Sequence, residues 1–210
     1  MKRDRSTTEP GEIPRFVPDE PFPPYAYVPG RFPHPTSDPA GHSFGAAPTH
    51  PSSLDPNHWE TSRPYLYGVD LFNHGYYWEA HEVWEGLWHA CGRAGLTGWF
   101  IKGLIKLAAA GVKAREGKYP QGVRSHAHRA KELFQQVARQ LSPTQPRYMG
   151  LSLGELIGFA VEVNSRSEEA KGQPGTTAEV VFPFILFPYR ENGIEHDHPQ
   201  LRSSGQLHPE

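Results

Sequence analysis

Prolines divide this chain into two parts of different character. Of its 22 prolines, 14 lie at or before Pro64, in a stretch that is also rich in Gly, Ser, Thr and His. Proline fixes φ and moves the preceding residue to extended geometry, so helix is excluded over residues 1–63 and a sheet interior is unfavourable. The compact part of the 210-residue chain is therefore expected to be shorter than the chain itself.

The proline-rich stretch, residues 1–63, is predicted to be an extended N-terminal arm. Disordered segments are poor in aromatic residues, and burial of aromatic area stabilises a contact. An arm that lies on the folded body is therefore favoured, with a disordered tail and a polyproline ligand for another domain as the alternatives. The aromatic residues of the arm are Phe16, Phe22, Tyr25, Tyr27, Phe32, Phe44 and Trp59.

Residues 64–166 show the periodicity of helices. Apolar residues recur at spacings of three and four, and Gly75, Gly92, Gly117 and Ser142-Pro143 interrupt the pattern. Four or five helices with short connections predict an all-α fold, an antiparallel bundle. The expected helices cover residues 65–74, 76–90, 97–116, 120–141 and a segment that begins at Ser152 with an S-x-x-E capping box.

Residues 167–210 are expected to form a short extended segment and a tail. The apolar run 179–187 contains Pro183, which bars a central strand, so an edge-type extended segment that packs on the bundle is predicted. Three histidines further on, His196, His198 and His208, fit a solvated tail better than a metal site.

Charge and composition limit the classes of partner that the protein is expected to bind. A formal net charge of -2 provides no electrostatic footprint for nucleic acid or an anionic membrane surface. The start of the sequence lacks the apolar region of a secretory signal, and no apolar run approaches the roughly 18 residues of a membrane span. Cys91 is the single cysteine, which fits a reducing compartment. A cytoplasmic protein is expected, with a small molecule or a protein as its partner; a homo-oligomer is compatible.

The segment 78–89 carries the candidate chemistry. At about 100° per residue, two imidazoles and two carboxylates fall on one side of a helix, with Cβ atoms about 5–6 Å apart. These residues are His81, Glu82, Glu85 and His89. The spacing suits metal chelation or acid–base chemistry, and carboxylate and imidazole together favour a divalent transition metal, Zn, Mn, Fe or Ni. A solvated helix face with weak Glu–His pairs is the other interpretation.

Neighbouring helices supply further candidates. His126 lies next to the apolar stripe of its helix and can point inward as a ligand or base. Lys102 and Lys106 can pair with Glu82 or Glu85, and such an ion pair would compete with a metal.

Two segments of the helical part form a recognisable motif. They read Leu71-Phe72-Asn73-x-Gly75-Tyr76-Tyr77-Trp78-Glu79-Ala80-His81-Glu82-Val83-Trp84-Glu85-x-x-Trp88 and Gly103-Leu104-Ile105-Lys106. This motif resembles the family called domain of unknown function 309. The resemblance spans about residues 67–141 and implies a small helical protein, labelled by prediction as a metal-dependent hydrolase. It also marks Glu79 as part of the polar cluster. Lys106 departs from the family pattern, which usually has Gln there.

Two functional hypotheses follow. The first is a metal-dependent hydrolase with His81, Glu85 and His126 as ligands and Glu82 as the base that activates metal-bound water. The second is a non-enzymatic structural or interaction module without a cofactor, in which the cluster is a buried polar network. That network would also hold Glu79, His89 and Lys106, with Lys106 paired to a glutamate.

Overall fold

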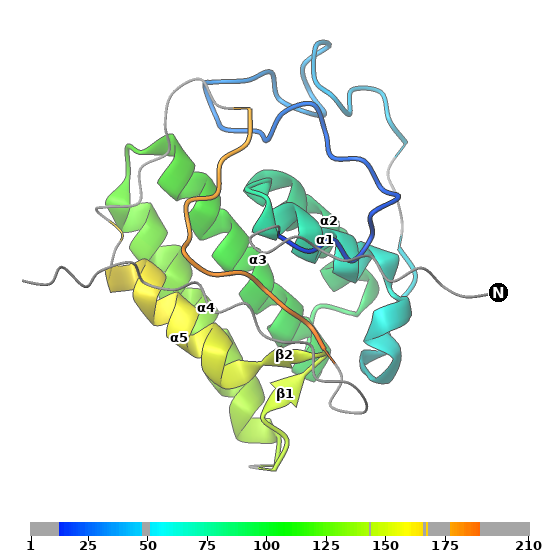
Figure 1. Cartoon of the computed structure of the whole chain (residues 1–210), viewed down its shortest axis with the longest axis vertical. Helices are drawn as coiled ribbons and strands as arrows, with labels where there is room; N and C mark the ends of the chain where they lie inside the picture. Colours follow the sequence, from blue (N-terminus) through cyan, green and yellow to red (C-terminus); the bar gives the residue numbers. More distant parts are fainter. Residues whose placement is uncertain (1–12, 48–50, 143, 166, 168–176, 190–210) are drawn as a thin grey trace, which may run out of the picture.

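The computed structural model describes residues 13–47, 51–142, 144–165, 167 and 177–189. The fold is mostly helical, which confirms the predicted all-α bundle, and Figure 1 shows α3 between α2 on one side and α4 on the other. In chain order the elements are the 3-10 helix η1 (Pro56–Thr61), α1 (Arg63–Asn73), α2 (Tyr77–Ala90), α3 (Gly95–Glu116), α4 (Pro120–Gln140), β1 (Arg147–Tyr148), β2 (Leu151–Ser152) and α5 (Leu153–Ser165).

Three short elements, η1, β1 and β2, differ from the expectation. The exclusion of helix before residue 64 is wrong, because η1 begins at Pro56. Proline suits a first helical position, where its missing N–H is not needed, and the Asp55 side chain caps this turn by accepting a hydrogen bond from the Asn57 amide. The antiparallel β1–β2 pair was not expected, since two residues a strand leave no alternating pattern to detect.

The helix ends follow local chemistry that is visible in the sequence. Ser62 caps α1 by accepting a hydrogen bond from the Tyr65 amide, and Ser152 accepts one from the Glu155 amide at the start of α5, as the capping box predicts. Gly117 ends α3 in the left-handed conformation, with φ of 68°.

Close helix contacts place α3 at the centre. A Cβ atom on Gly111 would lie 2.4 Å from the Tyr77 ring of α2, and one on Gly103 would lie 2.4 Å from the Phe134 ring of α4. Contrary to the expectation that no apolar run approaches a membrane span, α3 is long and apolar enough to cross a membrane by length and composition alone, but 61% of the relevant window is buried inside the protein. This burial is typical of the core helix of a bundle.

Both extended segments lie on the bundle. In the C-terminal segment, residues 177–189, Phe184 stacks on Phe159 of α5 with ring centroids 4.0 Å apart. The amide of Ala26 in the N-terminal arm donates a hydrogen bond to the Thr177 carbonyl. Figure 1 shows the two segments, in blue and orange, crossing the same side of the helices. The described part of the arm therefore packs on the body as predicted, whereas the three tail histidines lie outside the described residues.

The Tyr77–Gly111 contact predicts that no side chain larger than that of glycine is tolerated at position 111 without a loss of stability. Gly111→Ala inserts a methyl group where the Tyr77 ring already lies, so the free energy of unfolding should fall by about 1–3 kcal/mol, as measured by urea denaturation. Gly158→Ala in α5 is the matched control. Nothing lies within 4 Å of its new Cβ, and better helix propensity should raise stability by about 0.5–1 kcal/mol. Equal effects of the two substitutions would contradict the packing.

Candidate functional site

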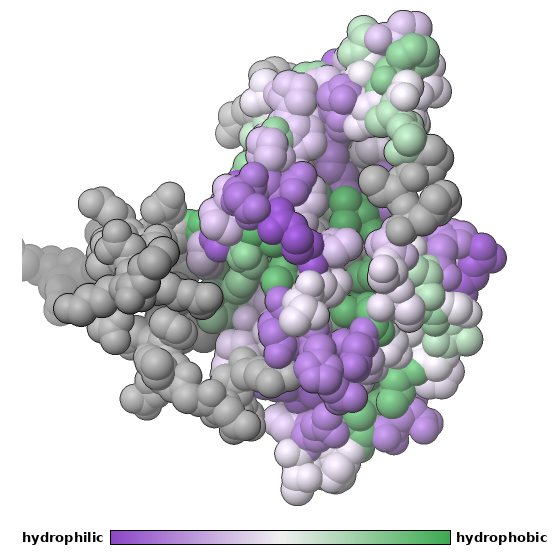
Figure 2. Space-filling view, turned by 90° about the vertical axis from the view of Figure 1, so that its right-hand side faces the viewer, coloured by the Kyte–Doolittle hydropathy of each residue, from purple (hydrophilic) through white to green (hydrophobic). Residues whose placement is uncertain are grey.

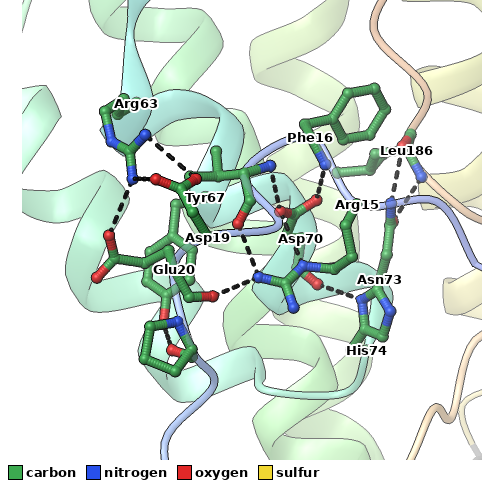
Figure 3. A network of polar contacts seen from close by, with 12 residues as sticks. Arg15, Phe16, Asp19, Glu20, Arg63, Tyr67, Asp70, Asn73, His74 and Leu186 are labelled. Atoms are coloured by element: carbon green, nitrogen blue, oxygen red, sulfur yellow. Dashed lines mark hydrogen bonds and ion pairs between the residues drawn. The ribbon is translucent and has the colours of Figure 1, made fainter. Parts of the chain in front are cut away.

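A buried carboxylate on α1 holds the start of the N-terminal arm (Figure 3). Asp70 is fully buried and accepts hydrogen bonds from the amides of Phe16 and Val17 at 2.7 and 2.8 Å. The Arg15 guanidinium donates to the same carboxylate at 3.0 Å. Three donors around one carboxylate compensate for its desolvation, so this contact fixes the path of the arm.

Two further polar side chains bind the C-terminal segment. The Asn73 amide group donates to the Leu186 carbonyl at 2.9 Å and accepts from the Leu186 amide at 2.8 Å. The Tyr77 hydroxyl accepts a hydrogen bond from the Val181 amide. A side-chain amide with one donor and one acceptor matches a peptide unit, so Asn73 takes the place that a neighbouring strand would have.

Glu79 belongs to this arm-binding set. It is 4% exposed, and its Oε1 accepts hydrogen bonds from the Tyr27 amide at 2.8 Å and from His42 at 3.2 Å. Burial raises the pKa of Glu79, although these bonds oppose the shift. Its Oε2 is buried without a hydrogen-bond partner in the described part of the chain. The structure thus separates Glu79 from the rest of the predicted cluster.

The other four members lie on the outer side of α2, as the helical spacing predicts. His81 and Glu82 pair at 3.2 Å, and Glu85 lies 3.7 Å from His89. His81 and Glu85 are half-buried, whereas Glu82 and His89 are exposed. Glu85 also forms an ion pair at 3.1 Å with Lys102.

Lys102, not Lys106, forms the ion pair with a cluster glutamate. Its Nζ lies 3.1 Å from Glu85 and 3.8 Å from the ring centroid of Trp88, which adds a cation–π contact. Lys106 and His126 are half-buried, and burial lowers the pKa of each. The pairing of Lys106 with a glutamate, expected for a buried network, does not occur within 4 Å among the described residues.

The proposed ligand set does not form a metal site in this arrangement. Among the described residues, no group of three or more His, Cys, Asp or Glu side chains lies close enough to hold a metal ion. Glu85 is engaged by Lys102, and an ammonium beside a carboxylate competes with a cation for the same oxygens. His81, Glu85 and His126 therefore do not fit a three-ligand transition-metal centre.

Glu82 lies at the edge of a hollow. A cavity of about 400 Å³ opens between α1, α2 and the arm. Figure 2, which views the side of the molecule that carries the arm and η1, shows apolar surface set between polar side chains. The cavity is lined by Val17, Glu20, Pro51, Arg63, Pro64, Tyr67, Glu82, Val83 and Gly86. Arg63 is already paired with Asp19 and Glu20, at 3.0 and 3.2 Å.

Several key polar residues escaped the sequence reasoning. Asp70 and Asn73 stand among buried apolar residues of α1, and a polar residue on a buried helix face is a signal that could have found them. Arg115 carries the same signal, because it lies on the buried face of α3, whereas His42 lies in the arm and carries none. Arg115 donates to the Ala26 carbonyl at 3.1 Å, a contact that exists only because the arm folds back.

Comparison with known proteins supports the family resemblance over part of the chain. Residues 65–125 match the model of a family described as Domain of unknown function (DUF309). The match runs from α1 into α4 and leaves both extended segments outside. Among curated proteins no match was found. The family description names no activity, so the hydrolase label gains no support from it.

The Asp70 contacts predict that one carboxylate holds the arm. Asp70→Asn places an amide group against three donors, so the free energy of unfolding should fall by about 3–5 kcal/mol. Hydrogen exchange at the Phe16 and Val17 amides should accelerate. Asp19→Asn is the control, because this exposed carboxylate forms its ion pair with the exposed Arg63, and loss of such a pair should change neither quantity appreciably. Retained protection in Asp70→Asn would contradict the assignment.

Proposed function

We propose that this protein is a non-enzymatic interaction module that binds a basic, partly aliphatic segment of a partner protein in the hollow beside Glu82. One observation carries the first half of this proposal. Glu79, the buried carboxylate of the predicted cluster, is bonded to the arm rather than directed at a substrate cavity. The desolvated carboxylate thus has a structural role.

The chemistry of the hollow supports the second half. Its apolar lining, including Val17, Val83 and Pro64, favours an aliphatic surface. Its charged lining consists of two carboxylates and one guanidinium, and the guanidinium of Arg63 is held by Asp19 and Glu20. The Glu82 carboxylate, which has a hydrogen bond with His81, thus adds a negative charge at that edge and favours a cationic group there.

A hydrolytic role is the second candidate. Glu82 lines the hollow, and His81 lies 3.2 Å from its carboxylate, so a paired imidazole and carboxylate stand beside a cavity. Such a pair can accept and donate a proton. The metal-dependent form of this hypothesis requires ligands that the arrangement of His81, Glu85 and His126 does not supply.

Elemental analysis tests the interaction proposal against the metal-dependent form of the hydrolytic candidate. We expect protein purified without an affinity tag or chelator to carry no stoichiometric Zn, Mn, Fe or Ni, and to take up none on addition of these ions. The double substitution His81→Ala/Glu85→Ala, with folding matched by circular dichroism, should give the same result. About one equivalent of metal in the native chain, lost in the variant, would overturn the interaction proposal in favour of the hydrolase.

A peptide titration tests the hollow itself. A blocked Leu-Arg-Leu tripeptide should shift the amide signals of Val83 and Gly86 in NMR spectra, and a blocked Leu-Glu-Leu tripeptide should not. Glu82→Gln should weaken the response severalfold, as expected for a partly exposed ion pair worth up to about 1 kcal/mol. Glu155→Gln, an exposed position on α5, should leave it unchanged. Equal responses to both peptides would refute the proposed partner chemistry.

A further inference from the structure

The N-terminal arm forms part of the wall of the hollow beside Glu82. Val17, Glu20 and Pro51 of the arm line the cavity, and the other lining residues belong to α1 and α2. Pro51 lies close to α2, because a Cβ atom on Gly86 would be 3.7 Å from its ring. The hollow is therefore a composite site, and its shape depends on where the arm lies.

Arg15 holds the turn of the arm that carries two of these wall residues (Figure 3). Its guanidinium donates to the Asp70 carboxylate at 3.0 Å, to the Val17 carbonyl at 2.9 Å and to the Glu20 carbonyl. The Glu20 amide closes the turn by donating to the Val17 carbonyl at 3.1 Å. The planar guanidinium, with several donors in a fixed fork, thus fixes the shape of the turn and attaches it to α1.

The outer side of the same turn is held more weakly. Arg63 pairs with Asp19 and Glu20 at 3.0 and 3.2 Å, and 47–68% of each of these side chains is exposed. Exposed ion pairs contribute little to stability. The Arg15 and Asp70 side chains are 22% and 0% exposed, so their charge-assisted hydrogen bond is the stronger attachment of the turn. The Arg15 side chain itself does not line the hollow.

We propose that Arg15 is a positioning residue for the hollow, so that docking of residues 15–20 on α1 is coupled to binding of a basic, partly aliphatic segment beside Glu82. This inference rests on the proposed function and adds the regulation of that site by the arm. A ligand that touches Val17 and Glu20 binds the docked arm better than the detached arm. By linkage, the ligand then stabilises the docked arm by the same factor.

The substitution Arg15→Gln distinguishes this coupling from simple charge attraction. Removal of a cation near an acidic site would, by charge alone, strengthen binding of a basic peptide. The coupling predicts the opposite: the blocked Leu-Arg-Leu tripeptide should bind the full-length variant at least about fivefold more weakly, measured by the amide signals of Val83 and Gly86 in NMR spectra. Arg139→Gln is the matched control, because it removes the same charge at an exposed position of α4, and it should bind like the native protein.

A second variant separates positioning from loss of the fold. Arg15→Lys keeps the charge beside Asp70, but an ammonium cannot reproduce the fork that holds both carbonyl groups. Its peptide affinity should lie between those of the native protein and Arg15→Gln. Circular dichroism verifies that all three variants are folded.

Hydrogen exchange measures the coupling in the other direction. The Phe16 amide donates to Asp70 at 2.7 Å, and Phe16 does not line the hollow. Saturation of the native protein with Leu-Arg-Leu should therefore slow exchange of this amide at least about fivefold, because the ligand stabilises the docked arm. A role of Arg15 in stability alone would leave this rate unchanged.

The outcomes separate this inference from the proposed function. Equal or tighter peptide binding by Arg15→Gln, or unchanged exchange at Phe16 in the peptide complex, would overturn the coupling and leave the proposed function standing. Failure of the native protein to bind Leu-Arg-Leu would overturn both.

Discussion

Hydrogen bonds between buried side chains of the helices and the main chain of two extended segments hold this structure together. Prolines keep the arm from pairing as a strand in a sheet interior, yet its amides still need acceptors once they leave water. The helices supply these partners through Asp70 and Glu79 for the arm and Asn73 for the C-terminal segment. Without them, the covered helix faces would carry unsatisfied polar groups.

The helical platform for these contacts depends on close packing around α3. Gly103 and Gly111 let aromatic rings of α4 and α2 approach the backbone of α3. The turn before α2 has a related requirement, because Gly75 has φ of 84° and a Cβ there would lie 2.3 Å from the main chain at Glu179. Gly75 is therefore required twice, once for the backbone conformation of the turn and once for the close approach of the C-terminal segment.

The structure divides the polar cluster by environment. Helical periodicity correctly groups His81, Glu82, Glu85 and His89 on one side of α2, because this depends only on 100° per residue. It could not place Glu79 under the arm, since the Tyr27 amide comes from 52 residues away in sequence. The sequence motif suggests metal chelation, but its residues have two separate roles in the structure. Glu79 anchors the arm, and the other members form an ion-paired surface beside the hollow.

The sequence by itself determined the five α-helices and approximately where they end, though not η1, because caps, glycines and the spacing of apolar residues act over a few neighbours. It also separated the proline-rich arm from the bundle. Tertiary structure alone decided which lysine pairs with Glu85 and which carboxylate is buried, since both depend on helices and segments that meet only after folding. Electrostatic and hydrogen-bond partners are set by distances in space, and a local pattern carries no information about those distances.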